Sequence, residues 1–342
     1  MSLAPAPLEP LTRSEAEAPP SLGRRFFNLH TLISFVLGFA ILVFLFTRVQ
    51  IDVGAIVERV RQANPLLLIA ALAAFYLTFP VRALRWRQLL GNVGFDKGHS
   101  GVLTEMILLS WFANCIVPAK LGDAYRAYLL KLDAGVSFST TIGTILAERI
   151  IDVVVLFCLM LSATTLSFGR ALPPEVLLLM QLGFGLVVAV TIGLVAMPRA
   201  RPLIERLLPN RLHTKYHAFE QGTLGSFRAM PTVVSLTALV WAGEVARLYL
   251  VTLSLGLTDI AQSVIVFVAL ASALMTTLPL TPAGLGFAEG TIVGIFLLAA
   301  RAGLAPGVDE HTAASIALLD RSISYWSLVA VGTVLYTVSK RK

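Results

Sequence analysis

Acidic residues and arginines stand together deep inside segments of this chain that are otherwise apolar. They form three sets: Glu148-Arg149-x-x-Asp152, Glu244-x-x-Arg247 and Asp320-Arg321. A charge near the middle of a bilayer costs about 2.5–3.5 kcal/mol on insertion scales, so such residues usually serve a function. Guanidinium groups bind phosphate through paired hydrogen bonds. The sets therefore predict a site for a phosphate-bearing ligand, with structural salt bridges between helices as the alternative.

The spacing within these sets predicts ion pairs along single helices. Glu148 and Asp152 are four residues apart and share a helix face, and Arg149 reaches Asp152 at i+3. Glu244 and Arg247 have the same i,i+3 spacing.

A seven-residue segment nearly recurs 164 positions further along the chain. The two copies, 118–124 and 282–288, match at five of seven positions. Arg82 and Arg247 precede the copies by 36 and 35 residues, and an acid–arginine pair follows each copy. Repeated halves with Pro- or Gly-broken segments at matching positions indicate the binding site of a transporter.

The elements that must position these residues are apolar stretches long enough to cross a hydrocarbon core of about 30 Å. Full spans are predicted at 29–47, 64–84, 140–167, 176–197, 231–256 and 312–338. Two further regions, 101–131 and 262–300, are interrupted by Pro118 and by Pro279 and Pro282, and proline breaks a helix. We expect each region to form the two short arms of a re-entrant hairpin.

The basic clusters set the orientation of the spans. They all fall on the cytoplasmic side when the N-terminus is cytoplasmic, as the positive-inside rule requires. Half 64–167 then runs opposite to half 231–338, with the basic cytoplasmic linker 198–230 between them. The predicted fold class is an all-α polytopic membrane protein, an inverted-topology repeat with six full spans and two broken re-entrant helical hairpins.

The domain organisation follows from the same reading. We expect residues 24–342 to form a single transmembrane domain and residues 1–23, rich in Pro, Ala and Glu, to form a disordered tail. The predicted location is the bacterial inner membrane, with both termini cytoplasmic.

The hairpin tips are predicted to bind an anion through their backbone. Thr281 suits a helix N-cap and Pro282 the first helical position, while Pro118 begins the equivalent arm. Two helix N-termini that face one another present unpaired N–H groups and partial positive charge. A kink that only lets helices pack closely is the alternative. The remaining hairpin residues assigned to substrate binding are Asn114, Lys120, Gly122, Asp123, Arg126, Gly284, Gly286 and Glu289.

Composition excludes a large soluble domain. The chain is 56% hydrophobic and 14% charged, with a mean hydropathy of +0.80, whereas soluble proteins have about 25% charged residues. The net charge is +7, and the basic clusters lie beside the predicted spans. This placement indicates that the partners are anionic lipid headgroups rather than nucleic acid. Arg82, Arg85 and Trp86, near a helix end, are predicted to contact headgroups at the interface.

The sequence lacks the motifs of common catalytic sites. H-E-x-x-H, the P-loop, G-x-S-x-G and C-x-x-C are all absent. We therefore expect no enzyme activity, no cofactor and no metal. His213 and His217 have the i,i+4 spacing of metal ligands, but solvated histidines are expected in a basic linker. Cys115 and Cys158 lie in apolar segments and are expected to be small core residues.

With these motifs placed, the chain resembles the transmembrane flippase-like domain of lysylphosphatidylglycerol synthases and their stand-alone relatives, over residues 25–340. The residues that carry the resemblance are Arg82-x-x-Arg85-Trp86, Asn114-x-x-x-Pro118-x-x-x-Gly122-Asp123-x-x-Arg126, Glu148-Arg149-x-x-Asp152 and Pro279-x-x-Pro282-x-Gly284-x-Gly286-x-x-Glu289-Gly290. The resemblance implies movement of charged or glycosylated lipids between leaflets, and relatives are also linked to hopanoid handling. No soluble aminoacyl-transfer domain follows the last span, so we do not expect lipid aminoacylation.

The predicted function is translocation of a phosphate-bearing or polyprenyl-linked lipid. Arg149 and Arg321 would neutralise the phosphate, and Arg126 and Arg247 would contact it on the way in from opposite faces. Acidic residues would hold the arginines between substrates or carry coupling protons: Glu148, Asp152, Glu289 and Asp320. Two alternatives are an integral-membrane enzyme acting on lipid headgroups and a non-transporting partner of a lipid-modifying enzyme.

Overall fold

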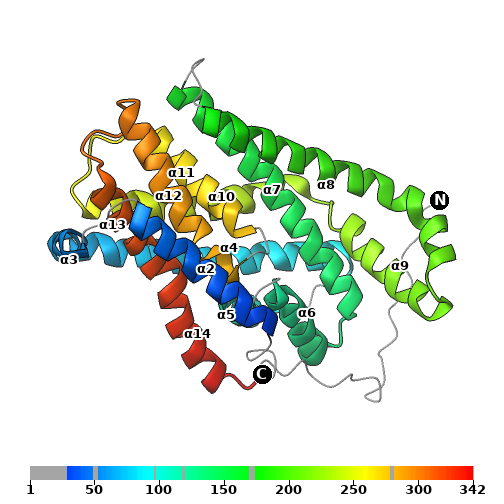
Figure 1. Cartoon of the computed structure of the whole chain (residues 1–342). Coiled ribbons are helices and arrows are strands. Elements are labelled where there is room, and N and C mark those ends of the chain that lie inside the picture. Colours follow the sequence, from blue (N-terminus) through cyan, green and yellow to red (C-terminus); the bar gives the residue numbers. More distant parts are fainter. Residues whose placement is uncertain are drawn as a thin grey trace.

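The computed structural model describes residues 29–48, 53–95, 98–117, 120–168, 174–277 and 281–341, and these residues contain helices and no strands (Figure 1). In chain order the helices are α2 (Leu29–Arg48), α3 (Val53–Gln62), α4 (Pro65–Asn92), α5 (Ser100–Ile116), α6 (Leu121–Ala134), α7 (Phe138–Phe168), α8 (Pro174–Leu207), α9 (Asn210–Gly225), α10 (Met230–Ser254), α11 (Gln262–Thr277), α12 (Phe287–Arg301), α13 (Glu310–Arg321) and α14 (Ser327–Val338). A short 3-10 helix, η2 (Pro282–Gly284), precedes α12, and a π-helical turn, η3 (Ser322–Trp326), joins α13 to α14. The predicted tail, residues 1–23, lies outside the described residues.

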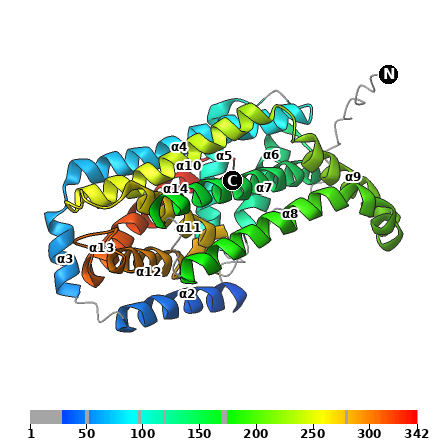
Figure 2. The ribbon, with the colours of Figure 1, turned by 90° about the horizontal axis from the view of Figure 1, so that it is seen from above.

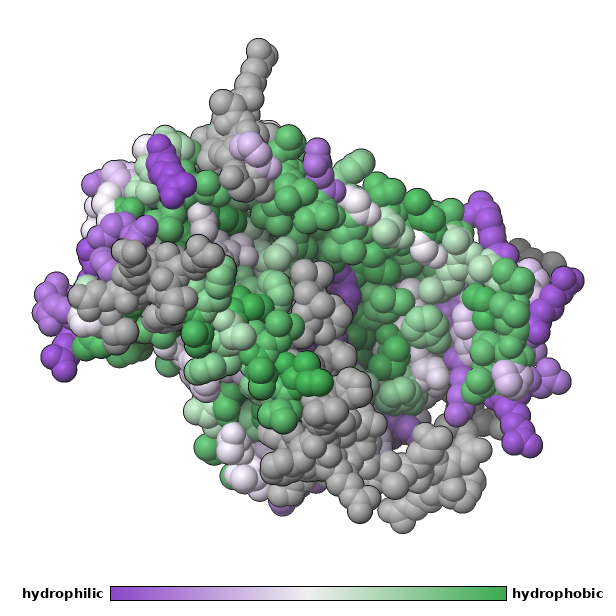
Figure 3. All heavy atoms as spheres, viewed as in Figure 1, coloured by the Kyte–Doolittle hydropathy of each residue, from purple (hydrophilic) through white to green (hydrophobic). Residues whose placement is uncertain are grey.

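Each of the six predicted spans falls on helical backbone, as the apolar stretches required. Within the described part of the chain, four helices are long and apolar enough to cross a membrane: Pro65–Asn92, Val176–Leu207, Met230–Ser254 and Pro282–Arg301. Much of their surface is hydrophobic, as the space-filling view shows (Figure 3). The chain is therefore an all-helical polytopic membrane protein, while the number of crossings stays a prediction.

Two sets of helices repeat the same order of lengths. The long α4, the short α5 and α6 and the long α7 correspond to α10, α11, α12 and the α13–α14 rod, at an offset near 164 residues. The long helices that open the two sets lie side by side and antiparallel (Figure 2). Asn64 N–H donates to Ser254 O at 2.8 Å at one end, and Asn92 Nδ2 donates to Ser226 O at 2.9 Å at the other. Corresponding helices of the two halves thus run in opposite directions.

Both predicted helix breaks occur in the structure. α5 ends at Ile116 and α6 begins at Leu121, while α11 ends at Thr277 and α12 begins at Phe287. Pro118 and Pro279 lie outside the described residues. The two arms of each hairpin pack against one another, and Gly122 is required where α6 approaches α5, because a Cβ there would lie 2.0 Å from Ser110 O.

The repeat extends to the backbone conformation of the hairpin tips. Lys120 (φ 54°) and Gly284 (φ 71°) are 164 positions apart, and both adopt left-handed conformations. Glycine takes this conformation freely, whereas a residue with a side chain loses about 1–2 kcal/mol there. A lysine kept in such a conformation at one tip is a feature that the sequence comparison alone did not predict.

The second arm begins with a helical turn at the predicted residues, but the turn is a 3-10 turn and not the start of the α-helix. Thr281 does not cap a helix with its side chain, because its hydroxyl donates to Leu285 O at 2.9 Å. Pro282 opens the 3-10 turn η2, and positive φ angles at Ala283 and Gly284 stop the turn from continuing. The α-helix starts five residues later than predicted, at Phe287.

The basic linker 198–230 is largely helical. α8 continues through the first basic residues to Leu207, and α9 packs closely along α7 (Figure 1). The contact depends on small residues, since a Cβ on Gly222 would lie 2.2 Å from Thr140 O. Arg201 Nε of α8 pairs with the buried Glu220 of α9 at 2.9 Å. These contacts fix the position of the N-terminal half of α7.

We expect Gly222→Ala to destabilise the protein, because the methyl group meets backbone atoms that cannot rotate away. Overpacking of this kind lowers the free energy of unfolding by about 1–3 kcal/mol. Thermal unfolding in detergent measures the effect. Gly185→Ala, in α8 where a Cβ meets no atom within 4 Å, is the control and should raise the free energy of unfolding by about 0.5–1 kcal/mol. Equal melting temperatures for the two variants would contradict this account of the α7–α9 contact.

Candidate functional site

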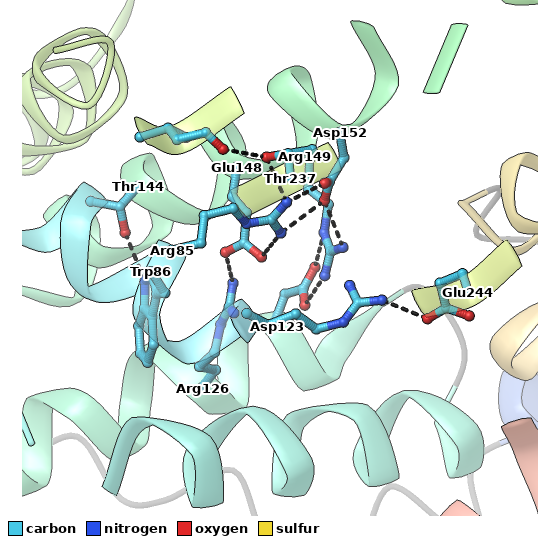
Figure 4. Close-up of polar contacts among 12 residues, drawn as sticks. Arg85, Trp86, Asp123, Arg126, Thr144, Glu148, Arg149, Asp152, Thr237 and Glu244 are labelled. Atoms are coloured by element: carbon cyan, nitrogen blue, oxygen red, sulfur yellow. Dashed lines mark hydrogen bonds and ion pairs between the residues drawn. The ribbon is translucent and has the colours of Figure 1, made fainter. Parts of the chain in front are cut away.

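A first ion-pair network joins α4, α6 and α7 (Figure 4). Arg85 donates to Glu148 Oε1 at 2.6 Å and to both carboxylate oxygens of Asp152 at 2.5 and 3.2 Å. Arg126 donates to the second oxygen of Glu148 at 2.8 Å. Glu148 therefore lies between two guanidinium groups, and all four side chains are buried. The sequence predicted the charged set on α7 but not the arginine of α4 as its partner.

The partners around this network place Arg85 and Trp86 in the protein interior. Thr237 of α10 accepts a hydrogen bond from Arg85 Nη1 at 3.0 Å. Trp86 Nε1 donates to Thr144 Oγ1 at 3.3 Å, and the guanidinium of Arg126 lies 4.5 Å from the centre of the Trp86 ring. Because Arg85 and Trp86 are both 0% exposed, the prediction that they contact lipid headgroups at the interface is wrong for this conformation.

One edge of the first network is partly open. Arg149 forms a two-pronged ion pair with Asp123, through Nε at 3.2 Å and Nη2 at 2.9 Å, and its side chain is 25% exposed. Its Nη1 lies 3.8 Å from Asp152, which confirms the predicted i,i+3 pair. Figure 3 shows a small hydrophilic area recessed within the largely hydrophobic face of the molecule.

Lys120 stands at this open edge, close enough to Arg149 and Asp123 to interact with both electrostatically. It is half-buried and takes the left-handed conformation directly before α6, three residues before Asp123. Within the described ranges, no carboxylate lies within ion-pair distance of its ammonium group. The first network therefore offers one unpaired cation next to its one accessible arginine.

A second network links α4 and α10 to α13. Arg82 donates to Glu244 Oε1 at 2.7 Å, and the other oxygen of Glu244 accepts from Arg247. Arg247 Nε also pairs with Asp320 Oδ1 at 2.8 Å. The predicted i,i+3 pair of Glu244 and Arg247 is confirmed. Arg82 is 3% exposed and its guanidinium lies 4.4 Å from the centre of the Trp111 ring, so the predicted headgroup contact is wrong for Arg82 as well.

Arg321 is held at the second hairpin tip. Its Nε donates to Glu289 Oε1 at 2.8 Å and its Nη2 donates to Ala283 O at 3.0 Å. The ring of Tyr325 lies 5.0 Å from the guanidinium, and the Tyr325 hydroxyl donates to Cys115 O at 2.9 Å. Arg321 thus connects the tip to the end of α5 and is 6% exposed.

The glycine N–H groups at the tips already have acceptors. Gly122 N–H donates to Asn114 Oδ1 at 2.8 Å, and Gly286 N–H donates to Glu289 Oε2 at 2.7 Å. These two donors are therefore not the bare anion-binding groups that the sequence predicted. Asn114, which was assigned to substrate binding, thus satisfies a backbone donor at the helix break.

The structure therefore divides the predicted site residues into two groups. Arg126 and Arg247, which we expected to contact a ligand on its way in, are 1% and 8% exposed and are held by carboxylates. The accessible part of the site consists of Lys120, Asp123 and Arg149. For most of the arginines, the salt-bridge alternative describes the present conformation.

Sequence analysis missed two neighbours of the networks, Thr237 and Trp111. Thr237 precedes Glu244 by seven residues, so both lie on one face of α10, and this spacing was a usable signal. No comparable sequence signal marks Trp111.

The linker histidines interact with α8 rather than with each other. His213 Nε2 lies 2.9 Å from Glu205 O, and His217 lies 3.1 Å from the Glu205 carboxylate. Among the described residues, no group of three or more His, Cys, Asp or Glu side chains is arranged to hold a metal ion.

An all-helical chain with membrane-length apolar helices and buried arginine–carboxylate networks is a polytopic membrane protein. The chain belongs to the family described as the lysylphosphatidylglycerol synthase transmembrane region, whose profile matches residues 32–332. This confirms the resemblance drawn from the motifs.

Three relatives illustrate the range of the family. A UPF0104 membrane protein of Methanocaldococcus jannaschii is 32% identical, over 67% of this chain and 95% of the relative. A UPF0104 membrane protein of Methanothermobacter thermautotrophicus is 26% identical, over 82% of this chain and 87% of the relative. Glycosyltransferase AglD of Haloferax volcanii is 27% identical, over 89% of this chain but only 53% of the relative. No solved structure matches the chain.

Proposed function

We propose that the protein is a flippase-like lipid transporter that moves a phosphate-bearing or polyprenyl-linked lipid between the leaflets of the bacterial inner membrane, with both termini cytoplasmic. The observation that carries the proposal is the unpaired Lys120 beside the partly exposed pair of Arg149 and Asp123. A cation in this position attracts an anion, and a neighbouring arginine adds two parallel donors that suit a phosphate.

The lengths of the hairpin arms support re-entrant hairpins, because the α-helix of each arm is shorter than the hydrocarbon core is thick. α5, α6, α11 and α12 have 17, 14, 16 and 15 residues, so each arm is about 21–26 Å long at 1.5 Å per residue. A hydrocarbon core is about 30 Å thick. Arms of this length fit re-entrant hairpins whose tips meet inside the membrane, with six full spans around them. The antiparallel α4 and α10 support the inverted-topology repeat.

The mechanism that we propose is an exchange of partners at the open edge. A lipid phosphate approaches Lys120, replaces Asp123 on Arg149, and leaves the buried pairs of Arg85 and Arg126 in place. The second network, around Arg82 and Arg247, connects the two halves through α4 and α10. Breaking and remaking the pairs across this contact would let one half rock against the other and open the site to the opposite leaflet.

Leaflet exchange of fluorescent phospholipids in reconstituted vesicles tests the proposal. We expect vesicles with the wild-type protein to exchange lipid faster than protein-free vesicles. Arg149→Gln should slow exchange about tenfold or more, because a charged hydrogen bond contributes about 1.5–3 kcal/mol. Arg301→Gln is the matched control, since Arg301 is an exposed arginine at the end of α12, and it should exchange lipid at the wild-type rate. No exchange by the wild-type protein would refute the transporter proposal.

A second candidate function is that of a non-transporting partner of a lipid-modifying enzyme. The observation that favours it is that this chain matches about half of a relative named as a glycosyltransferase. Vesicles that show no lipid exchange, together with a lipid-modifying activity that rises when the protein is added, would support this candidate over transport.

A further inference from the structure

When Lys120 is included, the charged groups of the two networks and of the second hairpin tip do not balance. Six arginines form ion pairs there: Arg82, Arg85, Arg126, Arg149, Arg247 and Arg321. Six carboxylates accept those pairs: Asp123, Glu148, Asp152, Glu244, Glu289 and Asp320. Lys120 is the additional cation, so these thirteen described groups together carry one net positive charge.

We propose that the site accepts a headgroup with a single ionised phosphate, a phosphodiester, and discriminates against phosphomonoesters and diphosphates. This inference rests on the proposed transport function and names its substrate class. Glycerophospholipids and polyprenyl monophosphate-linked sugars both contain a monoanionic phosphodiester, so both classes of lipid fit this proposal.

Because most of these charged groups are buried, the net charge of the site determines which ligand charge it accepts. Ten of the thirteen charged groups are buried, and the edge formed by Lys120, Asp123 and Arg149 is partly open. In such surroundings an uncompensated charge is costly, because little water screens it. One phosphodiester neutralises the site, whereas a dianion leaves a net negative charge among six carboxylates.

Hydrogen-bond donors are also in excess. The buried Nε–H groups of Arg82, Arg85 and Arg126 have no acceptor among the described residues. Buried polar groups are normally paired, so the described residues of the two networks leave guanidinium donors without an acceptor. A phosphate beside Lys120 supplies acceptor oxygens at the edge where a ligand can reach, without adding a second negative charge.

Leaflet exchange at pH 7, where a phosphomonoester is mostly dianionic because its second pKa is about 6, tests this preference directly. The probes are fluorescent phosphatidylglycerol and phosphatidic acid with identical acyl chains, and a polyprenyl monophosphate sugar against the corresponding diphosphate sugar. For the wild-type protein we expect the diester to exchange at least about tenfold faster than the dianion within each pair. The pair that is exchanged identifies whether glycerol or polyprenyl lipid is the source.

A charge variant makes the test specific to the site. Asp123→Asn raises the net charge of the site to two, and we expect it to shift the exchange ratio toward the dianionic lipid by about tenfold. Asp133→Asn is the matched control, because Asp133 lies on the same helix but pairs outside both networks, with Arg341. It should keep the wild-type ratio.

The outcomes separate this inference from the transport function. Equal exchange of diester and dianion by the wild-type protein overturns the charge preference and leaves transport intact, and this holds even if the variants fail to fold. An unchanged ratio in folded Asp123→Asn also overturns the preference. Exchange of no phosphate lipid at all refutes the transport function itself.

Discussion

Arg85→Met should lower the free energy of unfolding by about 3–5 kcal/mol, because removing one partner of a buried ion pair leaves the others uncompensated. Arg85 is 0% exposed and holds both Glu148 and Asp152. Methionine fills a similar volume but offers the two carboxylates no donor. Thermal or denaturant unfolding in detergent, followed by helical signal, measures the loss.

Arg341→Met is the matched control for this prediction. Arg341 also bridges two carboxylates, Glu105 at 2.6 Å and Asp133 at 2.8 Å, but its side chain is 34% exposed. Exposed pairs contribute about 0–1 kcal/mol, so its loss should be several times smaller. If the two variants lost equal amounts of unfolding free energy, the ion pairs of Arg85 would be no more shielded from water than those of Arg341.

Lys120→Gly should make the protein more stable and should slow the lipid exchange that we propose. Glycine relieves a left-handed conformation that costs a side chain about 1–2 kcal/mol, and it reproduces Gly284, the residue at the same place in the other half. Loss of the ammonium group removes the one unpaired cation of the site. We expect exchange of phosphodiester lipids to fall about tenfold to a hundredfold, the equivalent of one charged hydrogen bond.

Lys120→Arg separates charge from backbone conformation. Arginine keeps the positive charge and the strained left-handed conformation, so both stability and exchange should stay near the wild-type values. The account fails if Lys120→Gly exchanges lipid as fast as the wild type while its stability rises. In that case the lysine would be a strained residue without a role in binding.

The sequence predicted the helices of this protein well, because apolar length and proline position determine them locally. The stretches around 64–84 and 231–256 are helices α4 and α10, and the breaks after Ile116 and Thr277 lie beside the predicted prolines. The antiparallel arrangement of α4 and α10 agrees with the inverted repeat that the basic clusters indicated. The i,i+3 pairs also followed from helix geometry alone.

The pairing between helices was not accessible from the sequence. In a segment that is apolar all round, the pattern does not tell which face meets protein and which meets lipid. Arg85 and Trp86 were therefore predicted at the interface, although α7 and α10 enclose them. For the same reason the sequence did not show which carboxylates hold Arg149 and Arg321, and the structure pairs them with residues of α6 and α12.

The hairpin tips were only partly predictable, because turn residues compete for the same backbone groups. Thr281 was predicted as an N-cap, but its hydroxyl donates to the carbonyl oxygen of Leu285. The N-cap residue of α12 is Gly286. The left-handed Lys120 became visible only when its backbone was compared with that of Gly284. This comparison identified the unpaired cation on which the functional proposal rests.

The most direct test of the proposed function is a density map of the protein in lipid nanodiscs that contain a phosphodiester lipid. The account predicts a phosphate between Lys120 and Arg149, within ion-pair distance of both, with Asp123 released from Arg149 and the pairs of Arg85 unchanged. A map in which Lys120 contacts a carboxylate and the tip of α5 and α6 holds no lipid would contradict it.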